Sequence, residues 1–84
     1  MSESKKIQIE RTQTGVRIEK RMLKVLKGLA EFHDVSLGDL IEVIVLHAFE
    51  GKELFSQEGL KKVSALKEVY EMDYGIGDLH SFTE

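Results

Sequence analysis

The chain has 84 residues, no cysteine and no proline, with 42% hydrophobic residues, 32% charged residues and a formal net charge of −3. These figures exclude a multidomain, a disulfide-stapled or a disordered protein, and they indicate one small domain. The longest unbroken apolar run, residues 43–46, is too short to span a membrane, and the first residues lack the apolar stretch of a secretory signal. We therefore expect a cytoplasmic protein.

The charges are distributed unevenly along the chain. Residues 1–27 hold eight Lys or Arg and three Glu, a net charge of +5, whereas residues 28–84 hold four Lys and twelve Asp or Glu, a net charge of −8. Such asymmetry indicates a basic face that meets an anionic partner. A basic stretch that is simply a solvated surface is equally compatible with the charges alone.

The N-terminal part has a β-like composition. Ile7 and Ile9 alternate with polar residues, and Val16 and Ile18 flank a basic residue. The first pair has odd residue numbers and the second pair has even ones. One straight strand would therefore place the two pairs on opposite faces. A hairpin turn over residues 12–15, a bulge at Gly15, or a loosely attached arm would each explain this difference. We therefore treat residues 1–12 as a flexible basic arm or an extra strand.

A helical period begins near Glu19. Apolar residues form one stripe up to residue 30, and the residues expected to face away from it are Lys20, Arg21, Lys24, Lys27 and Glu31. The helix should end at residues 31–34, because Asp34 tolerates the left-handed conformation of many helix exits. Ser36 is the predicted N-cap of a second helix that runs from residue 37 to about 50. This second helix is apolar nearly all round, which favours burial against another subunit.

The remaining segment, residues 52–84, is predicted to hold a third helix and a tail. Ser56 is the expected N-cap of this helix, which should extend to about Met72 with apolar residues at spacings of three and four. Residues 74–84 contain two glycines and no sustained period, and this pattern predicts an irregular tail.

Residues 13–50 resemble the ribbon-helix-helix family of dimeric Arc/MetJ/CopG-type DNA-binding proteins. The resemblance lies in a short strand ending at Ile18, a helix, a tight turn, and an N-cap serine, Ser36, eighteen positions after the last inward strand residue. It implies a mainly α fold with one short β-strand and an intertwined ribbon-helix-helix homodimer over residues 13–51, with a third C-terminal helix added. In that family, the two strands form a ribbon that enters the major groove of DNA.

The resemblance also assigns roles to individual residues. Gln13, Gly15 and Arg17 would face the bases, and the backbone amides at Ser36 and Leu37 would hold a phosphate. Arg17 suits guanine and Gln13 suits adenine, while Gly15 offers no side chain for reading. Lys5, Lys6 and Arg11 are candidates for further phosphate contacts. The expected dimer core comprises Val16, Ile18, Leu26, Leu40, Ile41, Ile44, Val45 and Phe49.

The predicted function is sequence-specific binding of double-stranded DNA as a homodimer, in the role of a transcriptional repressor. An antitoxin-type autoregulator is one form of that role, with residues 56–84 able either to dock a toxin protein or simply to cover their own dimer. The alternative is a dimeric interaction or scaffold module of the same fold without DNA readout. We expect no enzyme, since no nucleophile with a base and no paired carboxylates emerge, and no cofactor or metal site, since only three histidines and no cysteine are present.

Overall fold

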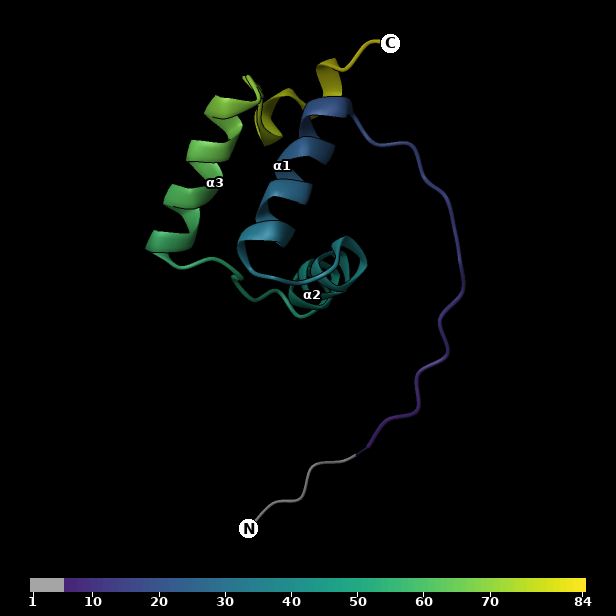
Figure 1. Cartoon of the computed structure of the whole chain (residues 1–84). Coiled ribbons are helices and arrows are strands. Elements are labelled where there is room, and N and C mark those ends of the chain that lie inside the picture. Colours follow the sequence, from purple (N-terminus) through teal and green to yellow (C-terminus); the bar gives the residue numbers. More distant parts are fainter. Residues whose placement is uncertain (1–5) are drawn as a thin grey trace.

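The computed structural model describes residues 6–84, which contain three α-helices and one short 3₁₀ helix. The helices are α1 (Lys20–Phe32), α2 (Leu37–Phe49) and α3 (Gln57–Val69), and the 3₁₀ helix is η1 (Ile76–Ser81). Helix α1 packs against both α2 and α3, with α2 crossing below the other two, and the chain before α1 is extended (Figure 1). No helix within residues 6–84 is long and apolar enough to cross a membrane.

Each α-helix begins at a side chain that caps its first turn. The carboxylate of Glu19 accepts a hydrogen bond of 3.1 Å from the backbone N–H of Met22. The hydroxyl of Ser36 accepts one of 3.1 Å from residue 39, and that of Ser56 one of 3.2 Å from residue 59. Such caps satisfy N–H groups that have no partner within the helix. Both predicted serine N-caps are therefore confirmed.

All three α-helices end in the same way, at one residue with positive φ. These residues are Asp34 (φ 56°), Gly51 (φ 63°) and Glu71 (φ 56°). In each case the next N–H donates back to a carbonyl five residues earlier, at 3.0, 2.9 and 2.8 Å, which completes a Schellman motif. The exit predicted at Asp34 is confirmed, whereas the third helix ends at Val69, earlier than the predicted Met72.

The core is small and centres on α1. Val25, Leu29 and Ala30 of α1 are buried together with Leu40 of α2. Gly28 allows α3 to approach closely, because an added Cβ there would lie only 3.0 Å from Cδ2 of Leu66. The packing therefore depends on a small residue at the crossing of α1 and α3.

The prediction of a mainly α ribbon-helix-helix fold with one short β-strand is wrong in its strand. Residues 6–84 form helices and connecting segments without any strand, and residues 6–19 are extended and largely exposed. Ile7 and Val16 are 71% and 73% exposed. A strand exists only where a second backbone segment supplies hydrogen bonds, and no segment of the described chain pairs with residues 6–19 as a hairpin. An alternating pattern of apolar residues is therefore insufficient on its own to predict a strand.

The C-terminal tail is more ordered than predicted. Residues 76–81 form η1, although residues 74–84 were expected to be irregular. The side chain of Asp78 accepts a hydrogen bond of 2.9 Å from the N–H of Gly75, which fixes the start of this turn.

Candidate nucleic-acid interface

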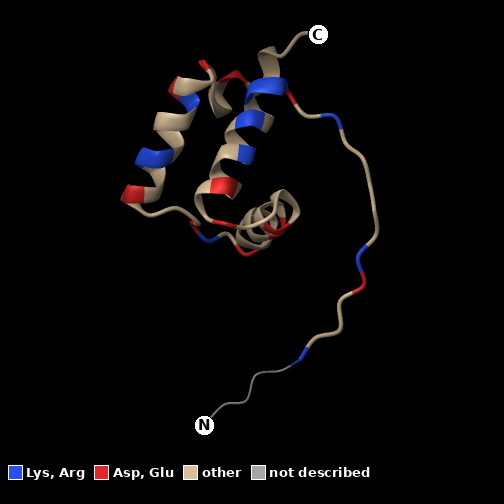
Figure 2. Ribbon diagram, viewed as in Figure 1, with Lys and Arg blue, Asp and Glu red and all other residues tan. Residues whose placement is uncertain are grey.

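Three lysines follow one another along the exposed side of α1. Lys20, Lys24 and Lys27 recur at helical spacings of four and three, and all three are exposed. Figure 2 shows Lys and Arg positions as blue bands along α1, with red acidic positions toward its far end. We call Lys20, Lys24 and Lys27 the basic row.

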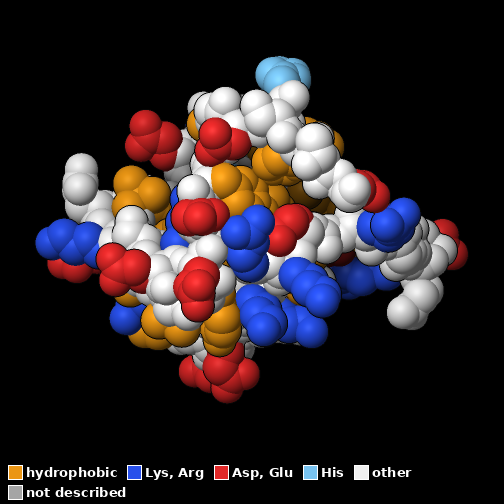
Figure 3. Space-filling model, turned by 90° about the horizontal axis from the view of Figure 1, so that it is seen from above, with side chains coloured by type: hydrophobic (Ala, Val, Ile, Leu, Met, Phe, Trp, Pro, Cys, Tyr) orange, Lys and Arg blue, Asp and Glu red, His pale blue; other side chains and the backbone are white. Residues whose placement is uncertain are grey.

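Among the described residues, the ammonium groups of the basic row do not form ion pairs with acidic side chains. None of the ion pairs formed among residues 6–84 includes a member of the row. Lys24 instead places its Nζ 5.9 Å from the centre of the Tyr70 ring on the end of α3. Seen from above, Lys and Arg side chains gather on one part of the surface (Figure 3). The row can therefore meet an external anion.

The predicted base-reading residues lie in the extended segment before α1. Gln13 and Gly15 are exposed, and the side chain of Arg17 is 93% exposed. Arg17 lies 3.6 Å from the carboxylate of Glu84, whose side chain is 89% exposed. An ion pair this exposed contributes little to stability, so it leaves Arg17 available to a ligand. The base-reading roles remain predictions.

Two of the predicted phosphate contacts differ in their surroundings. Lys6 is exposed, whereas Arg11 donates two hydrogen bonds, of 3.0 and 2.9 Å, to the carboxylate of Glu42 on α2. These bonds lower the pKa of Glu42 and attach the extended segment to α2. Arg11 must release Glu42 before it can bind a phosphate. The third residue of this group, Lys5, lies outside the described residues.

The predicted anion site at the start of α2 is also a cap. Ser36 is exposed and Leu37 is half-buried. The Ser36 hydroxyl already accepts the N–H of residue 39, so only the remaining amides of the first turn could bind an anion. The cap is confirmed, and the phosphate role remains a prediction.

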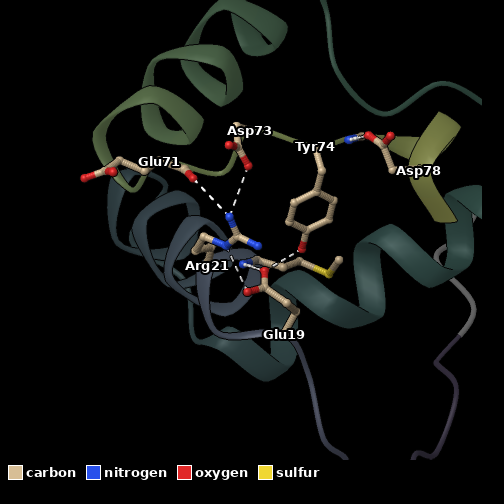
Figure 4. A network of polar contacts seen from close by, with 8 residues as sticks. Glu19, Arg21, Glu71, Asp73, Tyr74 and Asp78 are labelled. Carbon is tan, nitrogen blue, oxygen red and sulfur yellow. Dashed lines mark hydrogen bonds and ion pairs between the residues drawn. The ribbon is translucent and has the colours of Figure 1, made fainter. Parts of the chain in front are cut away.

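One basic residue of α1, Arg21, is committed to an internal network (Figure 4). Its guanidinium lies 3.0 Å from the carboxylate of Glu19 and 3.1 Å from that of Asp73, and it also donates to the Glu71 carbonyl at 3.4 Å. Tyr74 donates a hydrogen bond of 2.5 Å to Glu19. The network attaches the C-terminal segment to the start of α1.

These contacts shift the pKa values of both hydrogen-bonded partners. The hydrogen bond from Tyr74, assisted by those from Arg21 and Met22, lowers the pKa of Glu19 to about 2. Burial, with the hydrogen bond to Glu19, raises the pKa of Tyr74 to about 12. Glu19 is thus ionised and Tyr74 protonated across the neutral range. No local sequence pattern indicates this network, because it joins residues 19–21 to residues 71–74, which are 50 or more positions later in the chain.

The residues predicted for the dimer core fall into three classes within the single chain. Only Leu40 is buried. Four others are half-buried, namely Ile18, Leu26, Ile41 and Ile44. Val16, Val45 and Phe49 are exposed. Their burial in a dimer remains a prediction.

The side chains of residues 6–84 do not gather His, Asp or Glu in groups of three or more that could hold a metal ion. The histidine on α2, His47, places its Nδ1 2.8 Å from the carbonyl oxygen of Val43. This contact to the preceding helical turn gives the imidazole a structural partner.

Comparison with known proteins gives no match. No family model matches the sequence, and neither a curated protein nor a solved structure shows significant similarity to the chain.

Proposed function

We propose that the protein binds double-stranded DNA as a homodimer and acts as a transcriptional repressor. The observation that carries this proposal is the basic row of α1, which continues into an exposed, extended segment bearing Lys6 and Arg17. The acidic residues that dominate the chain overall lie mainly beyond residue 27. Cations are thus concentrated in the N-terminal third of the chain despite the net charge of −3.

The dimensions of the basic row suit a phosphate backbone. Lys20 and Lys27 are seven residues apart, a rise of about 10 Å along the helix axis. A strand of B-DNA advances about 3.4 Å per phosphate, so this length matches about three phosphates. Lysine ammonium groups are suitable contacts for phosphate oxygens.

The extended segment would supply the sequence-reading part of the contact. It lacks the hydrogen bonds of a strand, so it can follow a groove without first leaving a sheet. Arg17 can donate two hydrogen bonds to a guanine edge, and Gln13 can pair with an adenine. In a homodimer the two segments would read two half-sites related by symmetry. An antitoxin-type role, with a toxin bound to residues 56–84, is a narrower form of this proposal.

The proposal is tested by the salt dependence of DNA binding. Each phosphate contact contributes about 0.9 to the slope of log K against log salt concentration. The double variant Lys20→Gln/Lys24→Gln should therefore reduce this slope by about 1.8 on any DNA sequence. Fluorescence anisotropy with labelled duplexes over a range of salt concentrations measures both affinity and slope.

A matched variant removes the same charge from another place. Lys52 and Lys61 are exposed and lie outside α1, so Lys52→Gln/Lys61→Gln should leave the slope unchanged. Equal losses in the two double variants would show that only net charge matters. The absence of any binding at about 50 mM salt, where phosphate contacts are strongest, would reject the DNA-binding function.

The second candidate is a dimeric interaction or scaffold module. The observation that favours it is the exposed apolar surface of α2, on which Leu46 and Phe49 are 59% and 81% exposed. Surfaces of this kind mark contacts between proteins. A protein that dimerises without any affinity for DNA in the anisotropy experiment would support this function.

A further inference from the structure

The surface of the single chain is too large for a compact monomer. A folded protein of 9.6 kDa exposes about 5,100 Å² by the usual scaling with mass, whereas this chain exposes 7,853 Å². The extended segment accounts for part of the difference of about 2,800 Å². A stable protein interface covers about 800 Å² on each partner, so the excess is sufficient for one.

The outer side of α2 presents a convex apolar row. Val45, Leu46 and Phe49 are 38%, 59% and 81% exposed, and their spacing places them on one side of the helix. A helix in a small monomer normally turns such residues toward the core. Within residues 6–84, this side of α2 therefore lacks a covering surface.

The same chain also presents a concave apolar surface. A hollow of about 410 Å³ lies between the helices and the C-terminal segment. Its lining includes Leu26, Ile44, Val63, Ile76, Leu79 and Phe82, and its single charged side chain belongs to Lys67. The hollow would thus accept an apolar side chain.

We propose that a second copy of this chain covers the hollow, with the Phe49 end of its α2 inserted there. Twofold symmetry makes such a contact reciprocal, because each chain gives its convex row and receives its partner's. One interface then covers both apolar surfaces. A different partner protein would have to supply both a ridge and a hollow of its own, which a second copy already has.

The proposal gives the C-terminal segment a role as one wall of the interface. Ile76, Leu79 and Phe82 are 92%, 54% and 48% exposed although all three line the hollow. The network of Tyr74, Glu19 and Arg21 fixes this wall to α1. Residues 74–82 would therefore contribute to self-association, and this inference rests on the homodimer of the proposed function but not on DNA binding.

The contact can be tested by cross-linking, because the sequence contains no cysteine. Two differently tagged full-length chains, one carrying Phe49→Cys and the other Leu79→Cys, are mixed and treated with a short bifunctional maleimide. The proposal predicts a cross-linked product that carries both tags. The pair Phe49→Cys and Val69→Cys is the control, because Val69 is 67% exposed on α3 and does not line the hollow.

A second measurement avoids dependence on the engineered cysteines. Phe49→Asp should abolish the dimer in sedimentation equilibrium, as a monomer or with loss of folding, while Val69→Asp should retain a mass of twice 9.6 kDa. A wild-type protein that is monomeric and folded at micromolar concentration would overturn the proposal. So would equal cross-linking of the two cysteine pairs. Neither experiment contains DNA, so failure of DNA binding leaves both outcomes unaffected.

Discussion

Tyr74 donates a hydrogen bond of 2.5 Å to the carboxylate of Glu19, fifty-five residues earlier in the chain. The carboxylate also caps the first turn of α1 and pairs with Arg21. One side chain therefore starts a helix and holds the C-terminal segment against it. The two tasks are coupled, because a change in the charge of Glu19 alters both.

Tyr74→Phe should loosen the C-terminal segment while leaving the helices folded. The substitution removes the hydroxyl but keeps the ring that stacks edge-on against Phe82 at 5.2 Å. A hydrogen bond to a charged group is stronger than one between neutral groups, so its loss should be measurable as weaker attachment of this segment. Hydrogen exchange of the amides of residues 75–82 should accelerate. Tyr70→Phe is the control, since the Tyr70 hydroxyl makes no hydrogen bond within residues 6–84, and equal acceleration in both would contradict the prediction.

Acid should release the same segment in a defined pH range. The pKa of Glu19 is lowered from 4.5 to about 2 in the folded protein. The stabilisation from Glu19 is therefore complete above pH 4.5 and is lost as the pH falls through about 2. Tyr74 acts in the opposite sense, because its pKa is raised from 10.0 to about 12, and its contribution is lost as the pH rises through that value.

Nuclear magnetic resonance of the Tyr74 ring during an acid titration measures this release. Glu19→Gln removes the titrating group, so the transition near pH 2 should disappear from the Tyr74 signals. A transition that persists unchanged in this variant would show that another carboxylate controls the segment.

Glu71→Gly should stabilise the protein by about 0.5–1 kcal/mol. Glu71 has a φ of 56°, a region that costs an L-residue about 1–2 kcal/mol, part of which the greater freedom of glycine in the unfolded chain offsets. The carbonyl that accepts from Arg21 belongs to the backbone and is retained. Gly51→Ala is the reciprocal test, with an expected loss of about 1 kcal/mol because Gly51 has a φ of 63°. Urea denaturation measures the free energy of unfolding of both variants. A loss of stability in Glu71→Gly would contradict this prediction.

Gly28→Leu should destabilise the packing of α1 on α3 by about 1–3 kcal/mol. Even a single Cβ at this position would lie 3.0 Å from Cδ2 of Leu66, and a larger side chain has no space between the helices. Gly28→Ala is the informative control, because alanine adds about 1 kcal/mol of helix propensity while the end of Leu66 can shift. We expect near-neutral stability for alanine and a lower denaturation midpoint for leucine.

Arg17→Ala should weaken preference for one DNA sequence over another by about 1–3 kcal/mol. By contrast, Lys20→Gln should weaken binding to all sequences by a similar factor, because a phosphate contact carries no sequence information. Competition between specific and random duplexes distinguishes a loss of sequence preference from a uniform loss of affinity. Glu84→Gln removes the exposed partner of Arg17 without changing the arginine, and it should preserve the preference. A parallel loss on every sequence in Arg17→Ala would reject a base-reading role.

The helices could be predicted from the sequence because their signals are local. Ser36 and Ser56 are the N-caps of the second and third helices, as predicted. Asp34 adopts the expected positive φ. The exit at Glu71 was missed, since glutamate rarely takes this conformation and the apolar spacing continues to Tyr70. The strand was wrongly predicted because alternation records the faces of a segment and not the presence of a neighbouring one.

The candidate site could likewise be predicted from the sequence only where its signals are local. The lysines of the basic row share one side of α1 by spacing alone, so their exposure follows from the helical period. The pairing of Arg11 with Glu42, and of Arg21 with Asp73, joins residues 31 and 52 positions apart. No local pattern specifies which acid meets which arginine, because tertiary packing decides these distances.

The shared geometry of the three helix exits also makes the chain a suitable host for mirror-image residues. A residue of D chirality prefers positive φ for the same steric reason that an L-residue avoids it. D-alanine at Gly51, or at Asp34 and Glu71 in turn, would match the backbone already present. Chemical synthesis of such variants would convert each exit from a tolerated conformation into a favoured one without adding any contact.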